Sequence, residues 1–234
     1  MSIIVAGDIH GSWGPLNTLI SKKNPELILQ CGDFGWWPKF KKRASYIDRN
    51  GFRVQAWDPQ GIRPGNTIIR FCPGNHEDWD DLTNRDDFQL LPNVYYMPRG
   101  SLFTLPDNRV VLFMGGALSV DKHMRTPWVD WFPQELIPYS EFYKLKEKNI
   151  EKIDIVISHT CPLEFIPILQ KVNRYRSEYR DCSQDVLSAI LQEYKPDLWY
   201  FGHFHVNING RYNNTEWFCL NMTYQPYWWR YLDG

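Results

Sequence analysis

The hydrophobic residues of the chain gather in short apolar runs separated by amphipathic segments, which is the pattern of strands alternating with helices. Residues 2–6, 15–23 and 26–31 predict a strand, a helix and a second strand that pairs with the first in parallel. Further strands are expected at residues 67–72, 94–97, 102–105, 109–114, 153–158 and 198–201. Because short turns join the three strands between residues 94 and 114, we expect these to pair antiparallel.

Two more helices are expected in the second half of the chain. One runs over residues 133–149, starts with a proline in its first turn and is interrupted early by Pro138, whose ring a helix interior does not accommodate. The other runs over residues 183–194, with the Ser183 hydroxyl as its N-cap.

The C-terminal third predicts a hairpin of strands 206–212 and 216–221 that turns at Asn213 and Asn214. Strands interleaved with helices and then followed by hairpins indicate an α/β fold, with two packed mixed sheets flanked by helices. At 234 residues the chain can bury a large core as a single domain over residues 1–234.

Residues 35–66 interrupt the strand pattern with a stretch rich in Trp, Lys, Arg and Gly, which we interpret as a surface insertion with a short helix near residues 41–49. The formal net charge of -1 provides no global field for nucleic acid or for an anionic membrane. No apolar run approaches the roughly 20 residues that a membrane span needs, and no leader is visible at the N-terminus.

The five cysteines are odd in number and show no C-x-x-C spacing, so we expect buried thiols in a reducing compartment and a cytoplasmic location. Aromatic residues make up 16% of the chain. Two aromatic clusters, Trp36-Trp37-Pro38 and Tyr227-Trp228-Trp229, are candidates for the walls of a cleft, for a protein contact, or for packing under loops.

Residues with metal-binding or proton-transfer chemistry follow the ends of the predicted strands. They are Asp8, His10, Asp33, Asn75, His76, His159, His203 and His205, whereas His123 lies elsewhere. The carboxyl ends of strands in an open α/β sheet converge, so we expect these side chains to meet. On an extended segment, Asp-x-His and His-x-His would place both of their members on the same side. Imidazole, carboxylate and amide groups without cysteine suit manganese, iron or zinc.

The motifs G-D-x-H-G at 7–11, G-D at 32–33, G-N-H-E at 74–77, S-H at 158–159 and G-H-x-H at 202–205 together resemble the calcineurin-like metallophosphoesterase superfamily, over nearly the whole chain. The resemblance implies a four-layer αββα sandwich with two divalent ions at the strand ends. It implies that Asp33 bridges the ions, with a first site of Asp8, His10, Asp33 and His205 and a second site of Asp33, Asn75, His159 and His203.

Two ions about 3.5 to 4 Å apart can share a bridging hydroxide that attacks phosphorus, and they can hold the phosphoryl oxygens. We expect manganese, with iron or zinc as alternatives. His76 is placed to protonate the leaving oxygen, the alternative being a structural residue beside the ligands. Asn75 is also expected to contact the substrate.

The segment after Asp33 departs from the protein phosphatases and bis-nucleoside tetraphosphatases, because Phe34-Gly35-Trp36-Trp37 stands where these enzymes carry Asp-Arg-Gly. We therefore expect Arg125, helped by Lys122, to supply the missing phosphate-binding charge, unless this basic loop is only a solvated surface.

These observations predict a dinuclear metal-dependent hydrolase of a phosphate mono- or diester, acting on a small molecule, a nucleotide or a phosphoprotein. A nuclease is the second hypothesis, based on the local basic cluster Arg174, Arg176 and Arg180, but the net charge does not favour nucleic acid. A non-catalytic scaffold is the third. No membrane partner is expected, and the oligomeric state stays open.

Overall fold

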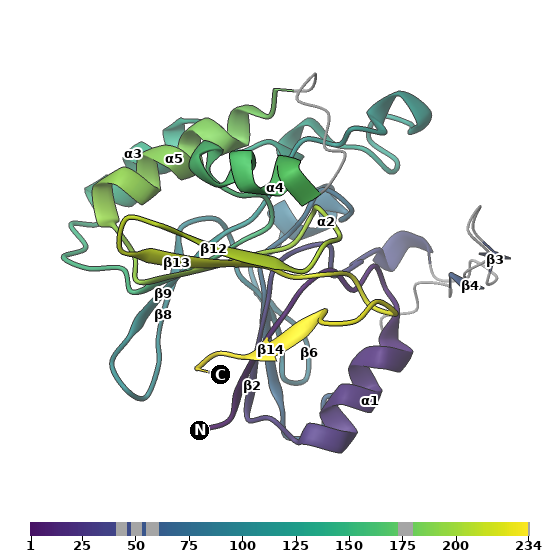
Figure 1. Ribbon diagram of the computed structural model, residues 1–234. Coiled ribbons are helices and arrows are strands. Elements are labelled where there is room, and N and C mark those ends of the chain that lie inside the picture. Colours follow the sequence, from purple (N-terminus) through teal and green to yellow (C-terminus); the bar gives the residue numbers. More distant parts are fainter. Residues whose placement is uncertain (41–45, 48–52, 55–60, 173–179, 234) are drawn as a thin grey trace.

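A computed structural model describes residues 1–40, 46–47, 53–54, 61–172 and 180–233 (Figure 1). Half of the predicted surface insertion, including most of its expected helix at 41–49, lies outside the described residues. The described parts contain a short 3-10 helix η1 (Pro38–Phe40) and a two-stranded antiparallel pair, β3 (Tyr46–Ile47) with β4 (Arg53–Val54), so residues 46–47 form a strand where a helix was expected. Arg174 and Arg176 also lie outside the described residues.

The first large sheet has the order β14-β1-β2-β5-β7-β6. Its strands are β1 (Ile3–Ala6), β2 (Leu27–Gln30), β5 (Ile68–Phe71), β6 (Gln89–Leu91), β7 (Val94–Tyr96) and β14 (Trp229–Tyr231). The strands β1, β2, β5 and β7 pair in parallel, and the edge strands β14 and β6 pair antiparallel with their neighbours. The predicted parallel unit of strand, helix and strand is thereby confirmed, with α1 (Trp13–Lys23) between β1 and β2.

The second large sheet has the order β12-β13-β11-β10-β9-β8. Its strands are β8 (Ser101–Thr104), β9 (Val110–Met114), β10 (Ile155–Ser158), β11 (Leu198–Phe201), β12 (Ile208–Tyr212) and β13 (Thr215–Cys219). The predicted hairpin at Asn213 and Asn214 is confirmed by the antiparallel register of β12 and β13.

Helices cover the outer faces of both sheets (Figure 1). The second sheet packs against α3 (Ser140–Glu147), α4 (Ile166–Val172) and α5 (Cys182–Tyr194). The first sheet packs against α1, and the short α2 (Trp79–Thr83) lies near the ends of its strands. Alternate residues of the strands, such as Val5, Leu29 and Ile157, fill a third core between the two sheets. The predicted four-layer αββα sandwich is confirmed.

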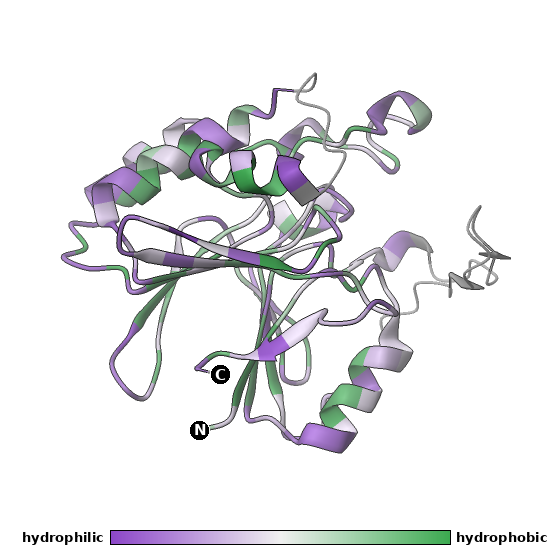
Figure 2. Cartoon of the chain, viewed as in Figure 1, coloured by the Kyte–Doolittle hydropathy of each residue, from purple (hydrophilic) through white to green (hydrophobic). Residues whose placement is uncertain are grey.

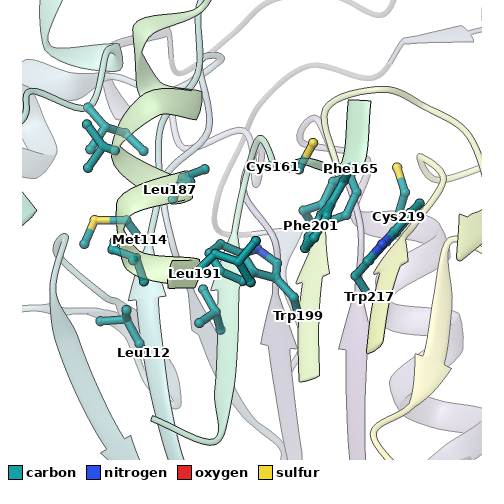
Figure 3. Packing of buried hydrophobic residues seen from close by; sticks show 14 of the residues in the cluster. Leu112, Met114, Cys161, Phe165, Leu187, Leu191, Trp199, Phe201, Trp217 and Cys219 are labelled. Atoms are coloured by element: carbon teal, nitrogen blue, oxygen red, sulfur yellow. The ribbon is translucent and has the colours of Figure 1, made fainter. Parts of the chain in front are cut away.

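The core beneath α4 and α5 contains a group of packed aromatic rings among aliphatic side chains (Figure 3). Phe165 stacks on Trp217 with ring centroids 5.0 Å apart, and Trp199 lies edge-on to Phe165 at 5.8 Å. The helices carry apolar and polar positions side by side (Figure 2), and the apolar residues Leu187 and Leu191 of α5 enter this core. Each fully buried large side chain contributes about 1.5–3 kcal/mol, so this layer fixes the strands that carry the C-terminal histidines.

Two predictions about the strands and helices were wrong. The strand predicted at 94–97 does not pair with the strand predicted at 102–105, because the chain crosses between the sheets at residues 97–100 and only β8 and β9 form an antiparallel pair. The helix predicted over 133–149 is a short 3-10 turn η4 (Pro133–Glu135) followed by α3. Leu136 is extended, and the residue before Pro138 is kept out of the helical region by the proline ring.

Two smaller predictions also need correction. The N-cap of α5 is Asp181, whose carboxylate accepts a hydrogen bond from the Ser183 backbone N–H, while the Ser183 hydroxyl accepts one from Ile137 N–H. Asp181 therefore caps the helix in place of Ser183, which lies two residues later. Cys182 is exposed, because it opens α5 at the surface, whereas the other four cysteines are buried as expected.

Candidate metal centre

The first ligand group lies where the chain leaves β1, β2 and β11. Asp8 and His10 follow β1, Asp33 follows β2, and His205 follows β11. Ligand atoms of these four side chains all lie within 4.8 Å of one another. His205 Nε2 is 2.9 Å from Asp8 Oδ2, and His10 Nε2 is 3.1 Å from His205 Nε2. The structure thus brings together all four residues expected at the first metal site.

The second ligand group consists of Asn75 after β5, His159 after β10 and His203 after β11. His159 Nε2 and His203 Nδ1 each lie 3.0 Å from Asn75 Oδ1. His159 Nδ1 donates a hydrogen bond to the Cys31 carbonyl oxygen at 2.8 Å, which turns its Nε2 towards the other ligands. Nitrogen and oxygen atoms that face one another in this way need a cation or a proton between them.

Asp33 stands between the two groups and faces each with a different oxygen. Its Oδ2 is 3.6 Å from His10 Nε2 in the first group, and its Oδ1 is 3.3 Å from His159 Nε2 in the second. Oδ1 also accepts a hydrogen bond of 2.7 Å from the His76 backbone N–H. One buried carboxylate therefore adjoins both groups, which is the arrangement expected of a bridging ligand.

The backbone at the ligands is not extended, and this part of the prediction was wrong. Asp33, His10, His203 and His205 all have left-handed conformations, with φ of 51°, 50°, 66° and 50°. The turn at His203 and His205 aims the two rings at different groups, His203 at Asn75 and His205 at Asp8. Four non-glycine residues in this sparsely populated region indicate a backbone held in place by its surroundings.

Two glycines let the backbone lie directly against the ligand carboxylates. A Cβ atom on Gly202 would collide with the Asp8 carboxylate, and a Cβ on Gly74 would collide with the Asp33 carboxylate. The two ligand groups together offer two carboxylates, one amide oxygen and four imidazoles. This set of donors fits a pair of divalent ions. The absence of thiolates from this set suits manganese, iron or zinc.

The amide of Asn75 is oriented by two residues that the sequence reasoning did not identify. Asn75 Nδ2 donates to Ser119 Oγ at 3.1 Å, and Ser119 Oγ donates to Glu135 Oε2 at 2.7 Å. Glu135 is itself held by the Ser119 backbone N–H and by Trp131 Nε1. Because the nitrogen of the Asn75 amide is occupied in this way, its oxygen faces the histidines. In the sequence, the one signal for this support of Asn75 is the isolated glutamate after Pro133, Glu135.

Glu77, the last residue of the third motif, supports the loop that follows Asp33. Its buried carboxylate accepts hydrogen bonds from the backbone N–H groups of Phe34, Gly35 and Trp36, at 2.7, 3.0 and 2.7 Å. Burial raises the pKa of Glu77 to about 8. The Trp36 and Trp37 side chains of this loop are buried, so they pack inside the protein instead of lining an open cleft.

His76 and Arg125 lie together beside the ligand groups. The His76 ring stands edge-on to the His10 ring, with centroids 5.1 Å apart, and contacts the Arg125 guanidinium, whose Nη2 is 2.8 Å from His76 Nδ1. Arg125 also donates to the Asn75 carbonyl oxygen and is paired with Asp121. The Arg125 side chain is only 8% exposed, so it is not part of a solvated surface.

The two other basic residues singled out in the sequence that the structure describes, Lys122 and Arg180, lie farther from the ligand groups. Lys122 is exposed in the short 3-10 helix η3 (Lys122–Met124), and within the described ranges no hydrogen bond or ion pair joins it to the ligand groups. Arg180 is exposed and pairs with Asp185 of α5. The structure therefore brings Arg125, but not Lys122, into contact with the predicted site.

Burial and the two carboxylates set the charge of the histidines. Burial lowers the pKa of His203 to about 3 and also lowers the pKa of His10. Burial opposes a charge on His159 and His205, but Asp33 raises the pKa of His159 and Asp8 raises that of His205. A divalent ion can take the place of the protons that these carboxylates attract.

Comparisons with known proteins agree with this geometry. The model of the calcineurin-like phosphoesterase family matches residues 1–207. The chain is 26% identical to the lariat debranching enzyme of Schizosaccharomyces pombe, over 92% of this chain and 51% of that protein, and 24% identical to that of Homo sapiens, over 89% and 42%. Its fold is similar to that of TT1561 of Thermus thermophilus, with a TM-score of 0.56 at 12% identity, covering 94% of this chain and 89% of that one.

The chain belongs to the calcineurin-like phosphoesterase family, as its motifs predict. At the level of the family, the prediction of a metal-dependent phosphoric ester hydrolase is confirmed. The chain spans about half the length of the curated relatives it matches. Within the described residues, no helix has the length and apolarity needed to cross a membrane.

Proposed function

We propose that the chain is a dinuclear metal-dependent phosphodiesterase whose substrate is a branched RNA. The observation that carries the reaction is Asp33, one buried carboxylate that faces both ligand groups. The first ion would be held by Asp8, His10, Asp33 and His205, and the second by Asp33, Asn75, His159 and His203. When bound, such a pair of ions supplies a deprotonated water at neutral pH and neutralises the charge of the phosphoryl group.

The side chains around the ions have separate tasks. Asn75, whose Nδ2 donates one hydrogen to Ser119, would present its oxygen to the second ion and its other Nδ2 hydrogen to an oxygen of the substrate phosphate. His76 adjoins the ligands and would donate a proton to the leaving oxygen once the charge of the bound phosphate offsets the burial that lowers the pKa of its ring. Arg125 holds the His76 ring and adds positive charge next to the phosphate, although its pairing with Asp121 makes this charge partly compensated.

The names of the relatives favour nucleic acid over the small molecules and phosphoproteins that were the first hypothesis from the sequence motifs. The three matching curated relatives are lariat debranching enzymes. A debranching reaction opens the phosphodiester at a branch. An internal ribose has only its 2′-hydroxyl free, so this phosphodiester joins a 2′ oxygen to the neighbouring chain. The chain's net charge of -1 requires that RNA is held by local contacts.

The test compares the manganese-loaded protein on four substrates. These are p-nitrophenyl phosphate, its bis ester, a linear RNA and an RNA of the same composition with one 2′ branch. A phosphodiesterase should hydrolyse the bis ester faster than the monoester and cleave the branched RNA at the branch. Preference for the monoester would contradict the proposed reaction, and equal cleavage of linear and branched RNA would contradict the proposed substrate.

Asp33→Asn tests the assignment of the bridging ligand. This variant should lose the bound metal, measured by elemental analysis after gel filtration, together with hydrolysis of the bis ester. Asp197→Asn is the matched control, because Asp197 is an exposed aspartate that pairs with Lys152 away from the ligands. The assignment is wrong if Asp33→Asn binds two ions as the control does.

A further inference from the structure

A groove of about 480 Å³ runs along α1 and is closed on its other side by the segment 224–229, part of the aromatic cluster noted in the sequence. Figure 1 shows α1 and the C-terminal strand β14, which contribute Lys22, Lys23 and Trp229 to the groove. Lys22 and Lys23 line it from the helix, and Tyr224, Trp228 and Trp229 line it from the opposite side. None of the described residues that line it is acidic.

This groove is joined to the metal centre by the backbone. Thr223, the residue before Tyr224, donates its backbone N–H to the Asp8 carbonyl oxygen at 2.8 Å and its hydroxyl to the Ile9 carbonyl oxygen at 3.2 Å. The Gly7 N–H donates to the Trp228 carbonyl oxygen at 2.7 Å. The segment that forms one wall of the groove is therefore hydrogen-bonded at both ends to the loop that carries Asp8.

The exposed aromatic ring of this wall is held in an unusual conformation. Tyr224 is 52% exposed, and its φ of 67° lies in the left-handed region that a bulky residue rarely adopts. Residues held in this region concentrate at functional sites. Below it, Lys23 Nζ lies 5.6 Å from the centroid of the Trp229 ring. Aromatic rings on one side thus face ammonium groups on the other, in a groove whose aromatic wall is hydrogen-bonded to the ligand loop.

We propose that this groove binds single-stranded RNA next to the phosphodiester at the metal centre, with a base stacked on Tyr224 and backbone phosphates on Lys22 and Lys23. Stacking platforms combined with cations are how proteins hold single strands without reading their sequence. The proposal extends the proposed function, since it names the part of the substrate beyond the cleaved bond. An acidic peptide could use the lysines but would leave the exposed ring without a role.

The experiment measures the binding of a fluorescent single-stranded RNA to the metal-free protein by anisotropy, so that no cleavage occurs. Tyr224→Asn removes the ring, and asparagine tolerates the left-handed backbone. Loss of one stacked base should raise Kd by about 5- to 100-fold. Tyr227→Asn is the matched control, because Tyr227 has φ of 60° and is 70% exposed on the same segment but does not line the groove.

A second variant, Lys22→Ala with Lys23→Ala, should lower the slope of log Kd against log salt by about 1.4, the contribution of two phosphate contacts on a single strand. Melting temperatures show whether each variant is folded. The proposal is overturned if wild type binds no RNA, if Tyr224→Asn binds as wild type does, or if both tyrosine variants weaken binding equally. If wild type binds RNA through the groove yet does not hydrolyse the bis ester, the proposed RNA-binding site is supported and the proposed reaction is wrong.

Discussion

Removal of the Ser119 hydroxyl tests how the second ligand group is held. In Ser119→Ala, the buried Asn75 Nδ2 loses its acceptor at 3.1 Å and Glu135 loses a donor at 2.7 Å. A buried group left unpaired costs about 1–3 kcal/mol of unfolding free energy. For a chain of this size, the melting temperature should fall by about 2–12 °C.

The same variant should also weaken metal binding. The Asn75 amide becomes free to rotate and to turn its nitrogen towards His159 and His203, where a ligand oxygen is needed. Loss of a partner behind a ligand typically reduces metal affinity 10–100-fold, so calorimetric titration with Mn²⁺ should show one of the two ions weakened by about this factor. The second ion should be affected, because Asn75 belongs to that group.

Ser188→Ala is the matched control for this experiment. Ser188, like Ser119, donates to a glutamate carboxylate, that of Glu164, but it accepts from the Leu163 backbone N–H instead of a ligand side chain and lies on α5 away from the ligands. It should lose stability and keep both metal affinities. The reasoning is refuted if Ser119→Ala binds both ions as tightly as Ser188→Ala does, since Asn75 then needs no support from Ser119.

Three further predictions concern the neighbours of the ligands. His76→Asn should keep its metal and lose about 10²- to 10⁴-fold in kcat, less on substrates with good leaving groups such as p-nitrophenol; equal losses for all leaving groups would exclude a proton donor. Arg125→Ala should lower kcat/KM on the best substrate, and Arg125→Lys should not restore it because lysine lacks the planar fork; wild-type kcat/KM in Arg125→Ala would show that the arginine is only structural. Burial raises the pKa of Glu135 from 4.5 to about 7, so the folded chain holds a proton that the unfolded chain releases, and the unfolding free energy falls as pH rises through this window. Glu135→Gln should remove the contribution of this one group to the slope in urea titrations on either side of the window, while the contribution of Glu77, whose pKa burial raises to about 8, remains; a slope equal to that of the wild type would show that Glu135 does not contribute.

Residues whose role is set by local pattern could be predicted from the sequence. The apolar runs place Asp8, Asp33, Asn75 and His159 at strand ends, and parallel pairing within the first sheet brings the first three together, whereas His159 joins them through the packing of the second sheet. The geometry within each turn could not be predicted, because the left-handed backbone at His205 depends on contacts from other elements.

Residues whose role is set by tertiary contacts were missed. Ser119 and Glu135 lie 16 positions apart, and neither belongs to a motif, yet they meet behind Asn75. The strand at Val94–Tyr96 was placed beside the wrong partner for the same reason, because its short connection to β8 crosses between sheets and leaves no local signal. Both the Ser119–Glu135 contact and the partner of this strand are set by how the two sheets pack, which the sequence pattern does not show.

The division of the ligands between the two sheets has a consequence for how the protein is made. Asp8, Asp33 and Asn75 follow strands of the first sheet, whereas His159 and His203 follow strands of the second. A chain still emerging from the ribosome can build part of the first sheet but holds an incomplete ligand set until its last third has been synthesised. Chains that end before His203 lack residues of both ligand groups, so metal-dependent hydrolysis is expected to begin only after the two sheets have docked.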